Sequence, residues 1–364
     1  MTIGIDASRA FLAKRTGIEE YSYQVIKHLR NELADERVAL YVRKGHIPDF
    51  DLPKSWRVQT VGWPRLWTQG GLALEMLFHP VDALFVPAHT VPWAHPKKTV
   101  VTVHGLEYEF CPEAYSRWER LYMRWSIRNS CRWASKVIAV SENTKRDLAR
   151  RYHVSIEKIA VIHEGVYDFL LKSESRTDDS SSEFLKLKPY FLFIGRIEAR
   201  KNVARMIEAF DRFKRKCGTN HQLVLAGKPG YGYEGIANCK LQITNSSDVV
   251  ELGYVSEEEK WKLLRNAEGF LFPSLYEGFG LPVLEAQSVG APVLTSNASS
   301  LPEVSGADSA VLVDPLSVED IARGIEKIAL DSDFRSAIIE SGSKNVTRFG
   351  WEACAKDIAE VLRG

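Results

Sequence analysis

Short apolar runs rich in β-branched residues alternate with longer amphipathic stretches along almost the whole chain. In the first half, the predicted strands are Ile3–Asp6, Val38–Val42, Val58–Val61, Ala83–Val86, Thr99–Val103, Val137–Val140 and Ile159–Ile162. The helical patterns between them include Ile18–Leu33, Arg117–Trp133 and Asn143–Tyr152. Strands that alternate with helices pair in parallel, because a parallel connection needs a long crossover. The chain is therefore predicted to be an α/β protein whose mostly parallel sheets are covered on both faces.

A second series of the same kind follows. Its predicted strands are Tyr190–Ile194, Gln222–Ala226, Val249–Leu252, Gly269–Phe272, Pro292–Thr295 and Ala310–Val313. Three predicted helices of this series start with a capping sequence, in which a serine precedes an acidic residue by three positions. These pairs are Ser256 with Glu259, Ser300 with Glu303, and Ser317 with Asp320. An amphipathic helix at Glu352–Leu362 closes the chain.

The polar segment Lys172–Lys188 separates the two series and has no periodicity, which is typical of a linker or mobile loop. We expect an N-terminal Rossmann-like domain at 1–170, a linker at 171–188 and a C-terminal Rossmann-like domain at 189–349. The closing helix, at about 350–364, is expected to pack back on the first domain. Ligands of open parallel sheets bind outside the carboxyl ends of the strands, so the cleft between two such domains is the predicted active site.

The composition argues against several classes of protein. A formal net charge of +1 gives no general argument for nucleic-acid binding. No apolar run approaches the roughly 20 residues of a membrane span. The five cysteines are widely spaced and include no Cys-x-x-Cys pair, so we expect neither a disulfide framework nor a zinc site. The chain starts directly on a strand pattern, without the basic region and apolar core of a signal peptide, which predicts a cytoplasmic protein.

The stretch Pro273–Gly290 is the strongest candidate for a functional site. A buried-strand pattern ends here, and a loop with Gly278 and Gly280 leads into a helix. The glycines allow a close backbone approach, and the N–H groups of the new helix attract an anion. Glu277 and Glu285 flank this spot, so a ligand with phosphate between two sets of hydroxyls, such as a nucleotide sugar, fits it. A purely structural interpretation is also open, since acidic residues at helix starts complement the helix dipole.

A second candidate, Gly195–Asn202, follows the first strand of the second series and opens a helix. Arg196 can bind phosphate oxygens bidentately, and Lys201 adds a point charge near the helix start. On its own, this segment would indicate a solvated basic turn without a binding role. Together with the glutamate stretch in a neighbouring βα unit, it favours phosphate binding.

The two stretches together resemble the signature of glycosyltransferase family 4. Gly195-Arg196 and Lys201-Asn202 match its first part, and Glu277 with Glu285 matches the family's Glu-x7-Glu motif. The resemblance covers nearly the whole chain and is clearest in the second half. It implies the GT-B architecture, in which two Rossmann-like domains with parallel sheets face each other across a central cleft. It also implies a retaining, metal-independent glycosyltransferase that moves a hexose.

Two further segments, Leu252–Ser256 and Ser300–Val304, are similar to the mannosyltransferase-type members of the family. They imply that the donor is GDP-mannose and that the acceptor is a glycan or a lipid-linked glycan, in polysaccharide or glycoconjugate biosynthesis. The same transfer from a UDP-sugar stays open as an alternative, as does a nucleotide-sugar epimerase or hydrolase on the same fold.

The resemblance also implies roles for individual residues. Arg196 and Lys201 would bind the donor diphosphate and stabilise it as it leaves, so that no protein acid is required. Glu277 would contact the transferred sugar, and Glu285 would accept hydrogen bonds from the ribose hydroxyls. The other donor contacts would come from Gly195, from the backbone of Gly278, Phe279, Gly280 and Leu281, and, beside the base, from Gly253 and Tyr254.

In the first domain, His104 ends a predicted strand and matches a family histidine that touches the donor sugar. Gly105 follows it where the family often has Asp, which argues against an acid–base role there. Gly17 resembles the family's glycine-rich loop near the phosphates, although Glu19 stands where many relatives have a further glycine. Glu164 replaces a more usual Asn and is given no role. The predicted catalytic residues are thus Glu277, His104, Arg196 and Lys201.

A row of arginines bears on whether the protein lies at a membrane surface. Arg120, Arg124, Arg128 and Arg132 recur every four residues along one predicted helix, with aromatic residues between them. Such a stripe can bind anionic lipid head groups, although exposed arginines are also common on a solvated helix face. A peripheral position at the inner face of a membrane is therefore one prediction of the sequence.

Other reactions fit the residues less well. A glycosidase that used Glu277 and Glu285 as its carboxylate pair would leave the two basic residues without a role. A nicotinamide oxidoreductase is disfavoured because no Gly-x-Gly-x-x-Gly follows the first strand. Intact motifs also argue against a non-catalytic binding protein. Asp331 and Asp333 resemble a metal-binding Asp-x-Asp, but their position before a helix favours capping, so no metal is predicted.

Overall fold

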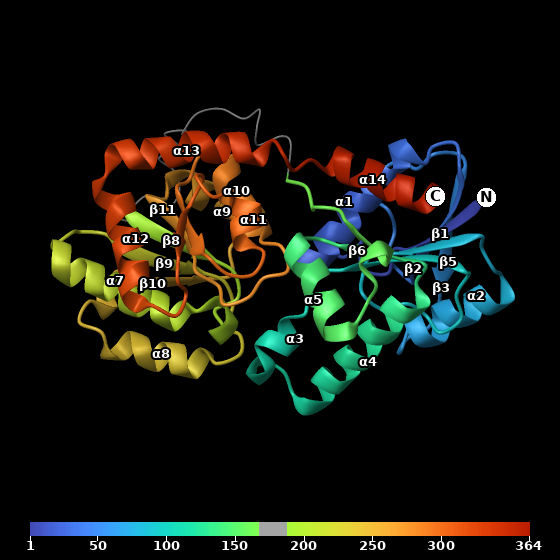
Figure 1. Cartoon of the computed structure of the whole chain (residues 1–364), viewed down its shortest axis with the longest axis horizontal. Coiled ribbons are helices and arrows are strands. Elements are labelled where there is room, and N and C mark those ends of the chain that lie inside the picture. The colour runs from blue at the N-terminus through green and yellow to red at the C-terminus, as the bar shows by residue number, and fades with distance from the viewer. Residues whose placement is uncertain (167–187) are drawn as a thin grey trace. The chain divides into compact units, whose positions relative to one another are not determined.

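The computed structural model describes residues 1–166 and 188–364. The predicted linker at 171–188 lies outside these ranges, apart from Lys188. The chain divides into two compact units, both drawn in Figure 1. The first unit comprises Met1–Glu109, Ser116–Gly165 and Phe349–Gly364, and the second comprises Phe110–Tyr115 and Val166–Arg348.

A parallel sheet with the order β3-β2-β1-β4-β5-β6-β7 forms the centre of the first unit. Its strands are β1 (Thr2–Asp6), β2 (Arg37–Arg43), β3 (Trp56–Val61), β4 (Ala83–Val86), β5 (Lys98–Val103), β6 (Lys136–Ala139) and β7 (Ile159–Val161). Every predicted strand of the first half is confirmed to within two residues. β4 is buried along its whole length, as the continuous apolar runs of a sheet covered on both faces require.

The α-helices that begin in the first unit connect these strands or cover the sheet. They are α1 (Gly17–Glu32), α2 (Ala73–Phe78), α3 (Glu107–Phe110), α4 (Arg117–Trp133), α5 (Glu142–Tyr152) and α14 (Trp351–Arg363). α14 packs against α1, as Figure 1 shows, and Arg363 binds Glu36 at 2.9 Å. The closing helix therefore belongs to the first unit, although the second unit precedes it in the chain.

The second unit repeats the arrangement with the strand order β10-β9-β8-β11-β12-β13. Its strands are β8 (Tyr190–Ile194), β9 (Gln222–Ala226), β10 (Val249–Gly253), β11 (Gly269–Phe272), β12 (Val293–Ser296) and β13 (Val311–Val313). Its helices are α7 (Val203–Cys217), α8 (Tyr233–Gln242), α9 (Glu257–Asn266), α10 (Leu281–Ser288), α11 (Leu301–Ser305), α12 (Val318–Leu330) and α13 (Ser332–Val346). α7 packs against α8 and α12, while α10 packs against α11 and α13 (Figure 1).

Each sheet has a point where the strand order reverses, next to the first strand of its unit. In the first unit this point lies between β1 and β4, and in the second it lies between β8 and β11. Loops from neighbouring strands diverge there and leave a crevice at the carboxyl ends, which is where open parallel sheets bind ligands. The fold thus provides one candidate binding position in each unit.

The helix starts test the predicted caps. Ser256 and Glu259 form a capping box, with bonds of 3.2 and 2.7 Å, and Ser317 accepts from the N–H of Asp320 at 3.1 Å. Asp331 accepts from the N–H of Phe334 at 2.9 Å and so caps α13, as the capping interpretation predicted.

The predicted capping box at Ser300 is wrong. Its hydroxyl does not cap α11 and instead donates to the carbonyls of Glu277 and Phe279, at 2.9 and 2.5 Å. These carbonyls belong to the buried loop before α10, where each polar atom needs a partner. Ser300 therefore stabilises that loop, which contains one of the predicted catalytic residues.

Candidate active site

Glycines occupy the carboxyl ends of three neighbouring strands in the second unit. Gly195 follows β8, Gly227 follows β9, and Gly253 ends β10. All three have positive φ angles, of 150°, 152° and 71°, which side chains rarely tolerate. A Cβ added to Gly227 would lie 1.8 Å from the carbonyl oxygen of Gly195. The glycines at 195 and 227 therefore let two backbones pack closely at this edge of the sheet, and no side chain projects from any of the three positions.

A buried cluster of charged side chains lies beside that edge. The Nζ atom of Lys201 is 2.6 Å from the carboxylate of Glu277, and the guanidinium of Arg200 is 3.1 Å from it. Arg200 also binds Glu198 at 2.9 Å. Glu277 is 8% exposed, so little water reaches its carboxylate. Predicted residues 76 positions apart in the sequence thus meet at the switch point of the sheet.

The cluster sets the charges of its members. Burial alone would raise the pKa of the Glu277 carboxyl, but the neighbouring Lys201 and Arg200 outweigh it and lower that pKa. Burial lowers the pKa of Lys201, and the attraction of Glu277 offsets this only in part. Glu277 is therefore an anion at neutral pH and is a poor general acid.

Contacts of the neighbouring backbone hold the segment that carries Lys201 in place. A short 3-10 turn at Ala199–Lys201 ends at Asn202, whose φ of 62° starts α7 from the left-handed region. The side-chain amide of Asn202 donates to the carbonyls of Pro273 and Pro315, at 3.0 and 2.6 Å. The N–H of Leu275 donates to the carbonyl of Arg200 at 2.9 Å. The loops after β8 and β11 are thus held together as one unit.

Glu285 lies on the second turn of α10, where the sequence predicted a ribose-binding residue. Its carboxylate accepts a hydrogen bond from Lys260 at 2.9 Å. Lys260 comes from α9 and also binds Glu257 at 2.8 Å. A Lys–Glu pair at this position holds the carboxylate in one orientation, ready to accept from further donors.

The other predicted donor contacts surround this cluster. Arg196 is exposed just beyond β8, and Tyr254 is 59% exposed, with Lys228 lying 5.3 Å from the centre of its ring. Gly278, Phe279 and Gly280 are buried in the loop before α10, and Leu281 is the first residue of that helix. Pro282 is thus the second helical residue, one place later than a typical first-position proline.

His104 is buried at the carboxyl end of β5 in the first unit. Its Nε2 atom lies 2.8 Å from the carbonyl oxygen of Pro87, and its Nδ1 atom lies 3.1 Å from the carboxylate of Glu164. A carbonyl only accepts, so Nε2 carries a hydrogen. The edge of the Tyr21 ring contacts the imidazole, with the ring centres 4.6 Å apart. Glu164, which had no predicted role, thus orients this histidine, whose catalytic role stays a prediction.

Gly17 is the first residue of α1, and a side chain there would meet no atom within 4 Å. Thr16 and Glu19 form a capping box around it. The Glu19 carboxylate also binds Arg9 at 3.1 Å. Glu19, which replaces a glycine of many relatives, therefore caps the helix and leaves the space above Gly17 open.

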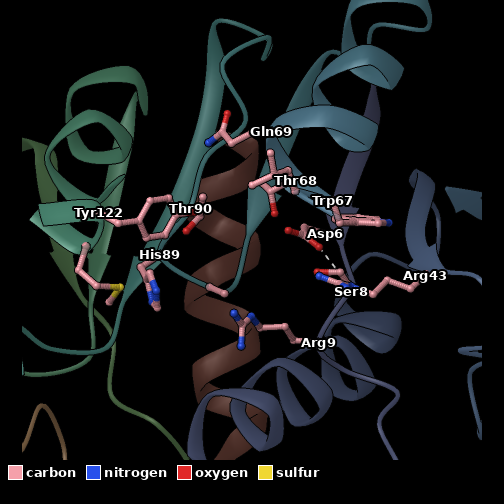
Figure 2. A pocket seen from close by; sticks show the side chains of 13 residues that line it. Asp6, Ser8, Arg9, Arg43, Trp67, Thr68, Gln69, His89, Thr90 and Tyr122 are labelled. Carbon is pink, nitrogen blue, oxygen red and sulfur yellow. Dashed lines mark hydrogen bonds between the residues drawn. The ribbon is translucent and has the colours of Figure 1, made fainter. Parts of the chain in front are cut away.

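A pocket of about 230 Å³ lies at the switch point of the first sheet. Figure 2 shows Asp6, the last residue of β1, and Arg9, which follows it, facing the same space as His89 and Thr90, which follow β4. The other lining residues are Ser8, Arg43, Leu66, Trp67, Thr68, Gln69, Ala88, Tyr122 and Met123. The pocket is smaller than the roughly 300–1,000 Å³ of sites for drug-sized ligands, so a ligand that fills it is no larger than a single sugar ring.

The titratable groups of this pocket have shifted pKa values. Burial raises the pKa of Asp6, although Ser8 and Arg9 counteract part of the effect. Burial likewise lowers the pKa of His89 to about 3, and the positive charge of Arg9 adds to this. The imidazole is therefore neutral at physiological pH, with one nitrogen that donates and one that accepts. An acid, a guanidinium, hydroxyls and a neutral imidazole around one space match the hydroxyl groups of a sugar.

Several residues of these two sites were not predicted from the sequence. Arg200 and Lys260 lie within predicted helical or loop segments and bind the two predicted glutamates. Arg200 could have been found, because it adjoins Lys201 in the same motif. Asp6 ends a predicted strand and His89 follows another, and the two strands are neighbours in the sheet. Nothing in the local sequence distinguishes them from other loop residues.

No group of three or more His, Cys, Asp or Glu side chains that could hold a metal ion occurs within residues 1–166 and 188–364. All five cysteines are thiols without a disulfide partner. Among the helices that the structure describes, none has the length and apolar character needed to cross a membrane.

Comparison with known proteins gives matches over both units. Residues 15–168 match the family described as Glycosyltransferase Family 4, and residues 174–345 match Glycosyl transferases group 1. The O-antigen chain mannosyltransferase B of Escherichia coli is 30% identical over 71% of this chain and 68% of its own length. The O-antigen chain mannosyltransferase RfbU of Salmonella typhimurium is 27% identical over 79% of this chain and 80% of its own length.

A solved structure supports the architecture. The Anabaena protein HepE in complex with UDP and glucose is similar over 100% of this chain and 99% of its own, with a TM-score of 0.74. The sequence identity in this alignment is 20%, so the likeness concerns the fold alone. The overall fold is thus shared with a protein whose crystals contain a nucleotide and a sugar.

Proposed function

The chain belongs to the group 1 and family 4 glycosyltransferases and has their GT-B fold, and from this premise we propose that it transfers mannose from GDP-mannose. The acceptor in this proposal is a glycan or a lipid-linked glycan, and the anomeric configuration is retained. The observation that carries the proposal is the buried contact of Lys201 with Glu277 at the switch point of the second sheet. It supplies a cation for a diphosphate and an anion for sugar hydroxyls within one hydrogen bond of each other.

In the proposed reaction, Lys201 and the exposed Arg196 bind the donor diphosphate. The bond between the sugar C1 atom and the diphosphate oxygen breaks, and the acceptor oxygen bonds to C1 on the same face. The proton of the acceptor hydroxyl moves to an oxygen of the departing phosphate. Negative charge that develops on the leaving group is stabilised by the two cations, which is the usual means of accelerating such a step.

The two glutamates have different tasks in this proposal. The anionic Glu277 accepts hydrogen bonds from the mannose hydroxyls. It also pairs with Lys201 and so holds this cation beside the leaving phosphate. Glu285, held by Lys260, accepts from the ribose hydroxyls. Neither glutamate needs to transfer a proton, in agreement with the lowered pKa of Glu277.

Mannose is favoured over other hexoses by the relatives. Two of them, aligned over more than two thirds of this chain, are named as O-antigen chain mannosyltransferases. The HepE crystals contain UDP and glucose, but that protein is only 20% identical to this chain. The mannose is therefore proposed on the strength of the closer sequence relatives, and the guanine base on the resemblance to the mannosyltransferase-type members of the family.

The acceptor is proposed to bind the pocket around Asp6 and His89. The pocket lies at the switch point of the first sheet and offers both hydrogen-bond donors and acceptors. Its volume of about 230 Å³ suits a single sugar ring. In this arrangement Asp6 and Arg9 bind hydroxyls of the acceptor's terminal sugar, and the neutral His89 adds a further donor and acceptor.

Calorimetric titration with GDP-mannose, UDP-glucose, ADP-glucose and dTDP-glucose tests the donor. We expect GDP-mannose to bind at least about tenfold more tightly than the others, a difference of about 1.4 kcal/mol. Tighter binding of UDP-glucose would overturn the mannose proposal. Incubation with GDP-mannose alone separates transfer from epimerisation, because an epimerase converts the donor without an acceptor.

A further inference from the structure

Two tryptophans of the first unit are exposed close to the acceptor pocket. Trp93 is 50% exposed and Trp63 is 45% exposed. Both contact the turn Thr68–Leu72, a π-helical turn that precedes α2. The turn begins with Thr68 and Gln69, which line the pocket (Figure 2). The two exposed indoles thus contact the same turn that forms part of the pocket wall, and π-helical turns are frequent at functional sites.

Trp93 is held in one orientation by Gln69. Its indole N–H donates to the backbone carbonyl of Gln69 at 2.9 Å, and its backbone N–H donates to the side-chain oxygen of the same residue at 3.1 Å. The side-chain amide of Gln69 in turn donates to the carbonyl of Val91 at 2.9 Å. Because the polar atom of the indole is already bound, the part of Trp93 that solvent reaches is apolar ring surface. A side chain that is fixed in advance loses little conformational entropy when a ligand binds to it.

Glycines of the same turn hold Trp63. A Cβ added to Gly70 would lie 2.5 Å from the Nε1 atom of Trp63, and one added to Gly71 would lie 2.7 Å from its Cβ atom. The Trp63 side chain therefore packs on the bare backbone of the turn. Leu66, which also lines the pocket, has a φ of 51° and is 74% exposed. Such a backbone conformation is costly for a leucine and is found mostly at binding and catalytic sites.

The size of the pocket decides what these indoles can bind. A volume of about 230 Å³ holds a single sugar ring, so the rest of a longer glycan must extend past the pocket wall. A pyranose ring has an apolar face of C–H groups, whose partial positive charge complements the negative face of an aromatic ring. An apolar protein surface at the same place would leave the polar groups of the pocket wall without partners, which is unfavourable. A glycan supplies both hydroxyls for the pocket and C–H faces for the indoles.

We propose that Trp93 forms a second sugar subsite for the acceptor. The terminal sugar occupies the pocket around Asp6 and His89, and the next sugar of the chain stacks on the indole ring of Trp93. Trp63, on the same turn, offers a further ring to the chain. This inference rests on the proposed function and narrows it, because the acceptor is then a glycan of at least two sugars. Trp93 thereby determines specificity for the length of the acceptor.

Calorimetric titration of the full chain without a donor tests the proposal. The ligands are the methyl glycosides, disaccharides and trisaccharides of mannose, glucose and galactose. In at least one of these series we expect the trisaccharide to bind about tenfold more tightly than the methyl glycoside, because of the added stacking contact. Trp93→Ala should remove this gain and leave the affinity for the methyl glycoside unchanged, whereas Trp93→Phe, which keeps an aromatic face, should retain most of it. Trp118→Ala is the matched control, since Trp118 is an 82% exposed tryptophan of the same unit.

The outcomes separate this subsite from the proposed acceptor pocket. Equal affinity of the wild type for all chain lengths, or binding of none of the three series, overturns the subsite. A gain with chain length that persists in Trp93→Ala overturns the role of Trp93. Asp6→Asn is expected to weaken the binding of every chain length by the same factor. If Asp6→Asn binds like the wild type while Trp93→Ala loses the gain, the subsite is supported and the pocket proposal fails; the reverse result supports the pocket and overturns the subsite.

Discussion

The two units share a strand order but use their switch points differently. In the second unit, three glycines bare the sheet edge, and a buried Lys201–Glu277 pair lies beside it. In the first unit, side chains from separate loops enclose a small polar pocket. A nucleotide diphosphate has the same chemistry in every donor, whereas acceptors differ from one enzyme to the next. In the proposed function, the second unit therefore carries the constant donor half of the reaction and the first unit carries the variable acceptor half.

The largest effect is expected at the charged cluster of the second unit. Glu277→Gln keeps the shape of the side chain but removes the anion that holds Lys201, and we expect kcat to fall by roughly 10²–10³-fold. The affinity for GDP-mannose should change by only a few fold. Steady-state kinetics with Glu340→Gln as control checks this, because Glu340 forms an exposed pair with Lys344. Near wild-type kcat in the Glu277 variant would refute the role proposed for this carboxylate.

Glu285 provides a second test of the donor half. A carboxylate that accepts from ribose hydroxyls contributes about 1.5–3 kcal/mol, so Glu285→Gln should raise the Kd for GDP-mannose by about tenfold or more. The Kd for mannose-free GDP should rise in parallel, because the ribose is common to both. A selective loss of GDP-mannose affinity, with GDP affinity kept, would instead place Glu285 against the sugar.

The acceptor half is tested by Asp6→Asn. The change replaces a carboxyl group that can bind sugar hydroxyls by an amide, and we expect the KM for the acceptor to rise by about tenfold. Asp35→Asn, in an exposed turn of the same unit, is the control. If the substitution leaves the acceptor KM unaltered, the pocket is not the acceptor site.

A smaller effect is expected from His89, on the pH dependence of stability and not on that of the acceptor KM. Because folding lowers its pKa to about 3, it stays neutral between pH 5 and 8, and its titration should not change the acceptor KM in that range. The unfolded state binds this proton more readily, so stability is lost as the pH falls from about 6.5 toward 3. His89→Asn should reduce that loss in acid unfolding experiments. A His89-dependent transition of KM near pH 6.5 would show that the imidazole is solvated.

The smallest effect is expected at Asp331, the residue that imitates a metal motif. As a helix cap it contributes about 1 kcal/mol, so Asp331→Ala should lower the free energy of unfolding by that amount without changing kcat. Treatment with EDTA should likewise leave transfer intact. Loss of activity in either experiment would point to a metal role for this segment.

Features set by local sequence patterns could be predicted from the sequence, whereas features set by tertiary contacts could not. The strands of both sheets follow from continuous apolar runs, and the motifs of Lys201 and Glu277 predict a site only when the two are taken together. The pairings of Lys260 with Glu285 and of Glu164 with His104 depend on tertiary contacts that no local pattern encodes. Ser300 fits a capping box by sequence, but the buried carbonyls beside it compete for its hydroxyl.

The arginine row shows the same limit. Its spacing suggests a basic stripe, yet the exposed face of α4 is aromatic and Arg124 is taken up by Glu109. A small difference between a period of four and one of 3.6 residues decides which side chains reach solvent. Surface chemistry on a long helix therefore needs the packed face to be known first.

One titration series tests most directly the proposal that the second unit binds the donor and the first unit binds the acceptor. Wild type, Glu285→Gln and Asp6→Asn are each titrated with GDP-mannose by calorimetry. We expect about tenfold weaker binding for the Glu285 variant and wild-type affinity for the Asp6 variant. Unchanged affinity in the Glu285 variant together with weakened binding in the Asp6 variant would contradict it, because the donor would then depend on the first unit.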